Sequence, residues 1–359
     1  MQIRNRTAEE GAMLKEIYTP GHDVFADTLI MHGVVRHLTA SGIVEGYVER
    51  LGERYKISFE GEPRALADIE SVELLLFEIE RYVVDGEEPL GRLRKIFDAN
   101  IKISATRSWL AQLSEALVNA ELSVFTLDHK AKFREGRTAS RRLFTVYPTL
   151  SPIYGKYFIE NRVAKENKAF GVCHTCFAYL NIGFLYGATT IVIITRDGRR
   201  VVQLTPAPRG RISIADLALL QRLTEGYLVR SQEMPTLAYP LYWLSTGETL
   251  YATEESLDIL VWVTEKRGNF LRVTDAMALD LSRIMEFIAE VKNKTRGWPK
   301  FVECLALEGP EILAQLTEVV LFGGDEYTVV RALSTSGKCA EDWRQVDILA
   351  EILFTWKLK

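Results

Sequence analysis

Hydrophobic and polar positions alternate with two different periods along this chain, and each change of period marks a predicted element. Apolar residues at helical spacing predict helices over residues 23–38, 66–83, 90–98, 107–119, 173–186 and 215–223. Alternating runs that flank turn residues predict β-hairpins over residues 43–60, 189–205 and 257–273. Helices and hairpins therefore share the first three quarters of the chain.

Several boundaries carry their own local signals. Asp23 follows a Pro-Gly pair and can cap the first helix, which Ser41-Gly42 ends, and Ser213 can cap the helix over 215–223. Pro206 and Pro208 are expected to close the second hairpin, because proline cannot donate to a sheet.

After Thr274 the alternating pattern is expected to stop. Helical spacing continues over residues 275–293, 309–322, 325–333 and 341–356. The predicted fold class is α+β, with a mixed N-terminal body of residues 1–273, built around antiparallel hairpins, and a C-terminal helical bundle of residues 274–359.

Composition places the chain among globular proteins. It has 359 residues, of which 47% are hydrophobic and 26% charged. The longest apolar stretch, residues 170–194, is interrupted by polar residues and does not offer the ~18–20 apolar residues of a membrane span. The first ten residues show no secretory leader, and four cysteines are too few for a disulfide scaffold, so we expect a reducing, cytoplasmic location.

Charge is unevenly distributed. Residues 129–212 contain fifteen Lys and Arg residues but four acidic ones, a net charge of +11, whereas the whole chain carries −4 and the remainder therefore −15. Such separation is typical of a surface that binds a polyanion, and nucleic acid is the commonest one.

Twelve of the fifteen cations of this basic region fall into four groups. One lies in segment 130–142 with Phe133, the second among the aromatic residues of 154–158, the third at a hairpin tip and the fourth in the loop after Pro208. Cations neutralise phosphates and aromatic rings stack on unpaired bases. The predicted nucleic-acid-binding residues are Lys130, Lys132, Arg134, Arg137, Arg141, Arg142, Lys156, Arg196, Arg199, Arg200, Arg209 and Arg211. A face for an acidic protein partner and a merely solvated face are the alternatives.

Cys173 and Cys176 form the one pair with the spacing of metal ligands. A structural zinc site needs four ligands; His174 is a candidate third, and Cys304 and Cys339 stand isolated in the helical unit. Packing at a helix start, metal binding and redox chemistry all remain open for the pair. We predict no cofactor, with zinc at Cys173 and Cys176 as the weak alternative.

Enzyme motifs are missing from the sequence. It contains no G-x-S-x-G elbow, no Walker A loop and no H-E-x-x-H helix. His32 is expected to be buried and hydrogen-bonded rather than a general base. The prediction is therefore a protein without catalytic residues; a metal-dependent nuclease or hydrolase, and a scaffold for an acidic protein, are the competing hypotheses.

Four features together resemble the large subunit of archaeal type I-A CRISPR Cascade effectors, the Csa-type large subunit. They are the opening helix over 23–38 with the hairpin after it, the sequence PIYGKYF at 152–158, the helix CHTCFAYLNIGFLYG at 173–187 leading through a basic hairpin into TPAPRG at 205–210, and the helical C-terminal unit. The resemblance covers nearly the whole chain. Some large subunits carry a four-cysteine zinc finger, of which this sequence matches Cys173 and Cys176.

This resemblance implies a non-enzymatic role. The subunit would lie near the 5′ end of the crRNA, recognise the protospacer-adjacent motif (PAM) on target duplex DNA and hold the displaced strand. Its implied partners are crRNA, target DNA, the other Cascade subunits and the helicase and HD nuclease, with no membrane. The hairpin at 196–200 and segment 130–142 are the candidates for the motif reader and the strand contact.

Overall fold

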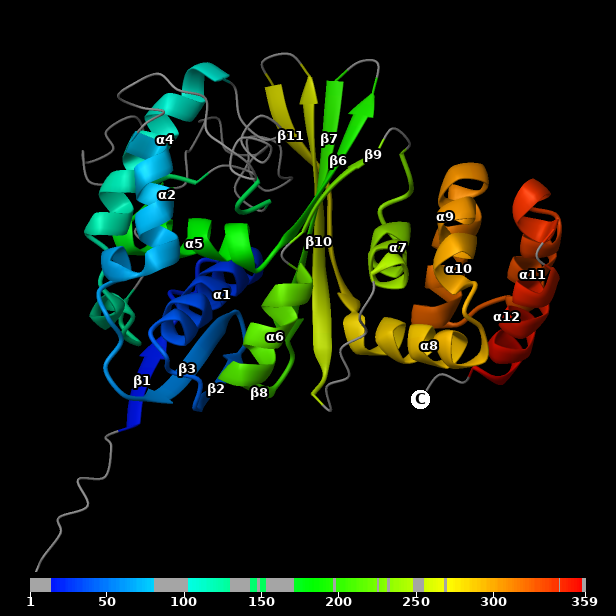
Figure 1. The fold of residues 1–359 in the computed structure, drawn as a ribbon, viewed down its shortest axis with the longest axis horizontal. Coiled ribbons are helices and arrows are strands. Elements are labelled where there is room, and N and C mark those ends of the chain that lie inside the picture. Colours follow the sequence, from blue (N-terminus) through cyan, green and yellow to red (C-terminus); the bar gives the residue numbers. More distant parts are fainter. Residues whose placement is uncertain are drawn as a thin grey trace, which may run out of the picture.

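The computed structural model describes residues 14–80, 103–129, 143–146, 149–152, 171–195, 198–224, 226–230, 233–247, 255–267, 270–341 and 343–356, and the account below concerns these residues. A five-stranded sheet stands in the middle of the molecule (Figure 1). Helices α1, α2, α4, α5 and α6 and the four-stranded sheet lie on one side of it, and helices α7 to α12 on the other. The chain is thus α+β with a helical C-terminal part, as the sequence predicts.

Strands in the two larger sheets run antiparallel, apart from the parallel pair β6–β9. The four-stranded sheet has the order β1-β3-β2-β8, formed by β1 (Leu14–Tyr18), β2 (Gly46–Leu51), β3 (Arg54–Glu60) and β8 (Arg211–Ser213). The five-stranded sheet has the order β11-β10-β7-β6-β9, formed by β6 (Thr189–Thr195), β7 (Gly198–Pro208), β9 (Gly226–Arg230), β10 (Leu257–Arg267) and β11 (Phe270–Asp280). A short pair joins β4 (Phe144–Thr145) to β5 (Gly171–Val172).

Two helices form the centre of the N-terminal body. Helix α1 (Val24–Ala40) packs against α5 (His174–Tyr186), and most residues of both are buried. The predicted cap is confirmed, because the Asp23 carboxylate accepts hydrogen bonds from the amides of Phe25 and Ala26. The remaining helices here are α2 (Glu70–Glu80), α4 (Ile103–Val118) and α6 (Ile214–Thr224), with 3-10 turns η1 (Leu66–Asp68) and η3 (Leu122–Val124).

Buried histidines tie α1 to its surroundings. His32 is fully buried; its Nε2 donates to the Pro206 carbonyl at 2.7 Å, and its Nδ1 accepts from Gln221 of α6 at 3.2 Å. Burial lowers the pKa of His32 to about 4. His32 is therefore a neutral, hydrogen-bonded core residue, as the sequence predicts.

The C-terminal helices pack around aromatic side chains. They are α7 (Ala238–Thr246), α8 (Leu281–Lys294), α9 (Trp298–Glu308), α10 (Pro310–Phe322), α11 (Glu326–Ser334) and α12 (Trp343–Thr355), with the 3-10 turn η5 (Gly337–Glu341). Phe287 of α8 meets Trp298 and Trp356 edge to face, at centroid distances of 6.1 and 5.4 Å. Helix α7 packs against α8, α9 and α10, so it joins this group although it precedes β10 in the chain.

Two predicted boundaries are wrong. Strand β11 continues to Asp280 and α8 begins at Leu281, because residues 275–280 pair with residues 258–263 of β10 and this pairing overrides the helical preference of Ala, Met and Leu. Pro206 and Pro208 lie within β7. The pairing of β7 with β6 reaches only as far as Leu204, so at the two prolines β7 pairs with β10 alone. The division of the chain at residues 273/274 stays a prediction.

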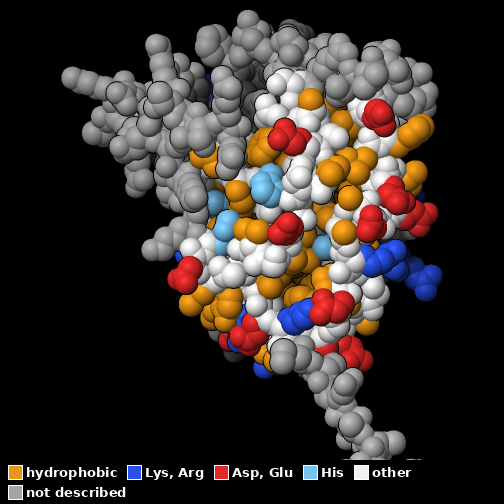
Figure 2. Space-filling model, turned by 90° about the vertical axis from the view of Figure 1, so that its left-hand side faces the viewer, with side chains coloured by type: hydrophobic (Ala, Val, Ile, Leu, Met, Phe, Trp, Pro, Cys, Tyr) orange, Lys and Arg blue, Asp and Glu red, His pale blue; other side chains and the backbone are white. Residues whose placement is uncertain are grey.

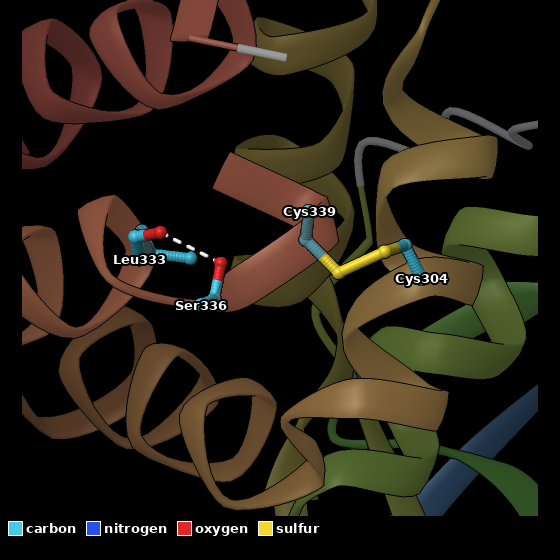
Figure 3. Close-up of a disulfide and its surroundings, with 4 residues drawn as sticks. All are labelled: Cys304, Leu333, Ser336 and Cys339. Atoms are coloured by element: carbon cyan, nitrogen blue, oxygen red, sulfur yellow. Dashed lines mark hydrogen bonds between the residues drawn. A yellow bond between two sulfur atoms is a disulfide. The ribbon is translucent and has the colours of Figure 1, made fainter. Parts of the chain in front are cut away.

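Cys304 and Cys339 are not isolated, contrary to the prediction from the sequence; they form a disulfide between α9 and η5 with a Cα–Cα distance of 5.7 Å (Figure 3). Near Cys339, Ser336 Oγ donates to the Leu333 carbonyl at 2.7 Å and ends α11. The Cys304–Cys339 pair therefore cannot complete a metal site with Cys173 and Cys176, which are free thiols.

None of the helices in the described residues has the length and apolar character needed to span a membrane.

Candidate nucleic-acid interface

Four of the predicted nucleic-acid-binding residues lie in the described part of the chain. Arg199 and Arg200 lie at the start of β7, and Arg209 and Arg211 follow its end. An eleven-residue strand is roughly 35 Å long, so the two pairs lie near opposite ends of β7. The structure does not bring these four residues together. The other eight lie outside the described residues: Lys130, Lys132, Arg134, Arg137, Arg141, Arg142, Lys156 and Arg196.

Arg209 is neutralised within the chain. Its guanidinium pairs with Asp258 at 2.6 Å and with Asp280 at 2.9 Å, and Arg50 pairs with the same Asp258 at 3.1 Å. Two cations thus meet two carboxylates from β10 and β11. The network fastens the turn after β7 to the beginning of β10, and it leaves Arg209 little capacity for a phosphate.

Arg211 is exposed and lies over an aromatic ring. Its guanidinium carbon is 3.4 Å from the centroid of the Tyr47 ring, which lies on the neighbouring strand β2. A stacked guanidinium keeps its charge and its hydrogen-bond donors while the ring fixes its position. Arg211 is therefore positioned as a single exposed cation.

The tips of two hairpins meet at the other end of the sheet. Strands β7 and β10 are antiparallel neighbours (Figure 1). Lys266 therefore pairs in register with Arg199, and Glu265 with Arg200. Arg200 forms an ion pair with Glu233, and Arg272 donates to the buried carboxylate of Glu265. We call five cations the hairpin-tip cluster: Arg199, Arg200, Lys266, Arg267 and Arg272. Two acidic residues, Glu233 and Glu265, lie beside it.

Three members of the hairpin-tip cluster, Lys266, Arg267 and Arg272, were not predicted from the sequence. Their charge is visible in the sequence beside the turn at 268–269, but the partner of that hairpin is not. The pairing of β7 with β10 joins segments that lie far apart along the chain, and only the fold supplies it.

Thiol groups and an imidazole gather at the start of α5. Nε2 of His129 lies 3.2 Å from Sγ of Cys176 and 3.7 Å from Sγ of Cys173. Cys173 caps α5 by accepting from the Cys176 amide at 3.4 Å. Hydrogen bonds from Cys176 and His129 lower the pKa of Cys173 to about 4, whereas burial raises the pKa of Cys176 well above its usual range.

His129 takes the place that the sequence prediction gave to His174. Among the described residues, the group that could hold a metal ion consists of His129, Cys173 and Cys176, with the three ligand atoms within 4.8 Å of one another. His129 lies 44 residues before Cys173. No local spacing rule could have found it.

Two buried carboxyl groups lie near this site, at the start of α1. Asp27 accepts hydrogen bonds from the amides of Gly21 at 2.7 Å and His22 at 2.6 Å. Burial raises the pKa of Asp27 to about 7 and that of Asp23 to about 6. Because backbone amides occupy both side chains, we assign them to shaping the helix start rather than to acid–base chemistry.

Comparisons with known proteins give the family. A model of the CRISPR-associated protein family Cas_Csa4 matches residues 15–356. A curated relative, the CRISPR system associated protein Cas8 of Thermoproteus tenax, is 35% identical over 338 residues, which cover 89% of this chain and 92% of the relative. The chain belongs to the Cas_Csa4 family. The predicted resemblance to a large subunit of an archaeal CRISPR Cascade is confirmed.

Family membership bears on whether the chain is an enzyme. Large subunits of the Cas8 type are generally non-catalytic components of Cascade, which agrees with the missing enzyme motifs.

Figure 2 shows the face of this Cas_Csa4 protein at the left of Figure 1; its described side chains include scattered acids and few cations. Among the described residues, we consider the hairpin-tip cluster and Arg211 as candidate contacts for a polyanion.

Proposed function

We propose that this Cas_Csa4 chain is a non-catalytic, nucleic-acid-binding subunit of a type I-A CRISPR interference complex in the cytoplasm. In this role it contacts target duplex DNA at its PAM, holds the displaced strand beside the crRNA and helps to recruit or activate the helicase and HD nuclease. Pairing with the guide RNA reads the target sequence in such complexes, so the protein needs phosphate contacts and a reader for a short motif.

The hairpin-tip cluster is the observation that carries this proposal. It combines two β-ribbons, which can approach a groove of duplex DNA, with five cationic residues, a type of residue that releases counterions from phosphates. The net charge of +11 over residues 129–212 supports the same role. We retain Arg199 and Arg211 as proposed contacts, and we keep Lys130, Lys132, Arg134, Arg137, Arg141, Arg142, Lys156 and Arg196 as predictions. Arg200 and Arg209 are balanced by carboxylates.

Removal of two hairpin-tip cations tests the proposal. The double variant Arg199→Ala/Lys266→Ala is expected to bind a short duplex DNA more weakly at 0.1 M salt, by roughly 10-fold for each phosphate that the protein no longer neutralises. Fluorescence anisotropy of a labelled duplex with the full chain measures the affinity, and circular dichroism verifies the fold.

The matched control removes two exposed cations elsewhere. Lys300 and Arg331 lie exposed in the C-terminal helical group, and the variant Lys300→Ala/Arg331→Ala changes the net charge equally. An equal decrease of affinity in both double variants would contradict a local contact at the hairpin tips. Unchanged DNA binding together with loss of an acidic protein partner would favour the scaffold hypothesis, and metal-dependent cleavage of DNA by the pure chain would favour the nuclease.

A further inference from the structure

We propose that His129, Cys173 and Cys176 bind a zinc ion, with water as the fourth ligand. This inference goes beyond the proposed function, because it concerns how the chain is held together whatever it binds. Two thiolates and an imidazole are a donor set that zinc prefers, and the two cysteines are three residues apart, as in many zinc sites.

The distances between the donor atoms fit a zinc site. With zinc bonds of about 2.3 Å to sulfur and 2.0–2.1 Å to nitrogen, sulfur and nitrogen ligands of a tetrahedron lie roughly 3.6 Å apart. Nε2 of His129 is 3.2 Å from one sulfur atom and 3.7 Å from the other. Small side-chain rotations are therefore enough to place all three donors around one ion.

The surrounding residues position the ligands. Cys173 lies at the cap of α5 and Cys176 in its first turn, so the helix fixes their relative orientation. The His129 amide donates to the Thr126 carbonyl at 3.0 Å, and the edge of the imidazole meets the buried ring of Phe125 at a centroid distance of 6.0 Å. Phe125 in turn packs against Tyr179 of α5. The site is thus built on a helix and a packed turn before an ion enters.

One side of the site is open to solvent, so an ion can reach it. Cys176 is buried, whereas Cys173 and His129 are partly exposed. The exposed side gives room for the water ligand. The site would attach the end of segment 122–129 to α5, directly before the basic segment that begins at residue 130.

Metal analysis of the full chain tests the proposal. After purification without chelators or metal-affinity resin, the wild-type chain is expected to hold about one equivalent of zinc, as a single site requires. Cobalt added to the metal-free chain should give the charge-transfer absorption of a thiolate–cobalt bond. Each of the variants Cys173→Ser, Cys176→Ser and His129→Ala is expected to lower the zinc affinity at least ~100-fold in competition with a chelator, because removal of a direct ligand exceeds the effect of an outer partner.

Controls keep the result independent of folding. The variant Cys304→Ser/Cys339→Ser removes the other two cysteines and should keep the zinc and the cobalt spectrum. A folded wild-type chain that takes up neither metal would overturn the proposal. Zinc affinity unchanged in the three ligand variants, or a disulfide between Cys173 and Cys176 in the purified protein, would overturn it as well.

Discussion

Replacement of Gly183 by alanine is expected to lower the free energy of unfolding by at least about 3 kcal/mol, at the upper end of overpacking effects. Gly183 lies where α5 crosses α1, and an added Cβ would overlap the backbone carbonyl of Leu29. Gly33 meets the backbone of Tyr179 in the same way from α1. Since backbone opposes backbone at both positions, rotation of side chains cannot relieve the overlap and the two helices must separate. Denaturant unfolding, followed by circular dichroism, measures the effect.

Gly210 provides the matched control for this prediction. It lies exposed in the turn between β7 and β8, and an added Cβ would meet no atom within 4 Å. Gly210→Ala is therefore expected to change the free energy of unfolding by less than about 0.5 kcal/mol, as is usual at surface positions. Equal stability of the two variants would show that the α1–α5 crossing is not as close as described.

Removal of the Cys304–Cys339 disulfide is expected to lower the free energy of unfolding by about 3–4 kcal/mol, because a cross-link over this separation restricts the unfolded chain. The two cysteines are 35 residues apart and join α9 to η5. Unfolding of the wild-type chain with and without reductant, and of Cys304→Ser/Cys339→Ser, measures the contribution.

Reductant should leave the stability of the double variant unchanged. An equal decrease of the free energy of unfolding in that variant would show that the reductant acts at another site. Free thiols at both positions in the purified protein would contradict the disulfide itself. Intracellular proteins of hyperthermophilic archaea are often rich in disulfides, so the bond does not require a secreted protein.

Local signals predicted much of this fold. The cap at Asp23, the end of α1 at Ser41 and the cap of α6 at Ser213 are short-range hydrogen-bond patterns, and each is present in the structure. Turns such as Arg196-Asp197-Gly198-Arg199 likewise locate hairpins from a few residues. Elements whose conformation depends on distant partners were harder to predict from the sequence. The end of β11 is set by its pairing with β10, and α7 lies in a helical group formed mostly by residues after 280.

The same distinction between local patterns and distant partners applies to the candidate site. Sequence identified the basic hairpin and the Cys173–Cys176 pair, because both are local patterns. It did not pair Arg199 with Lys266 or bring His129 to the two thiols. It also counted Arg209 among the nucleic-acid contacts, although Asp258 and Asp280 pair with it. Charge along the chain predicts the kind of ligand. Whether a given charged side chain is neutralised depends on the residues that the fold brings near it.

The salt dependence of DNA binding tests the central claim most directly. For the wild-type chain, the logarithm of the association constant for a short duplex should fall with the logarithm of salt concentration, with a slope between about −4 and −8. The Arg199→Ala/Lys266→Ala variant should give a slope that is shallower by about 2, or about one unit for each phosphate that is no longer neutralised. A wild-type affinity that stays flat in salt would contradict the account.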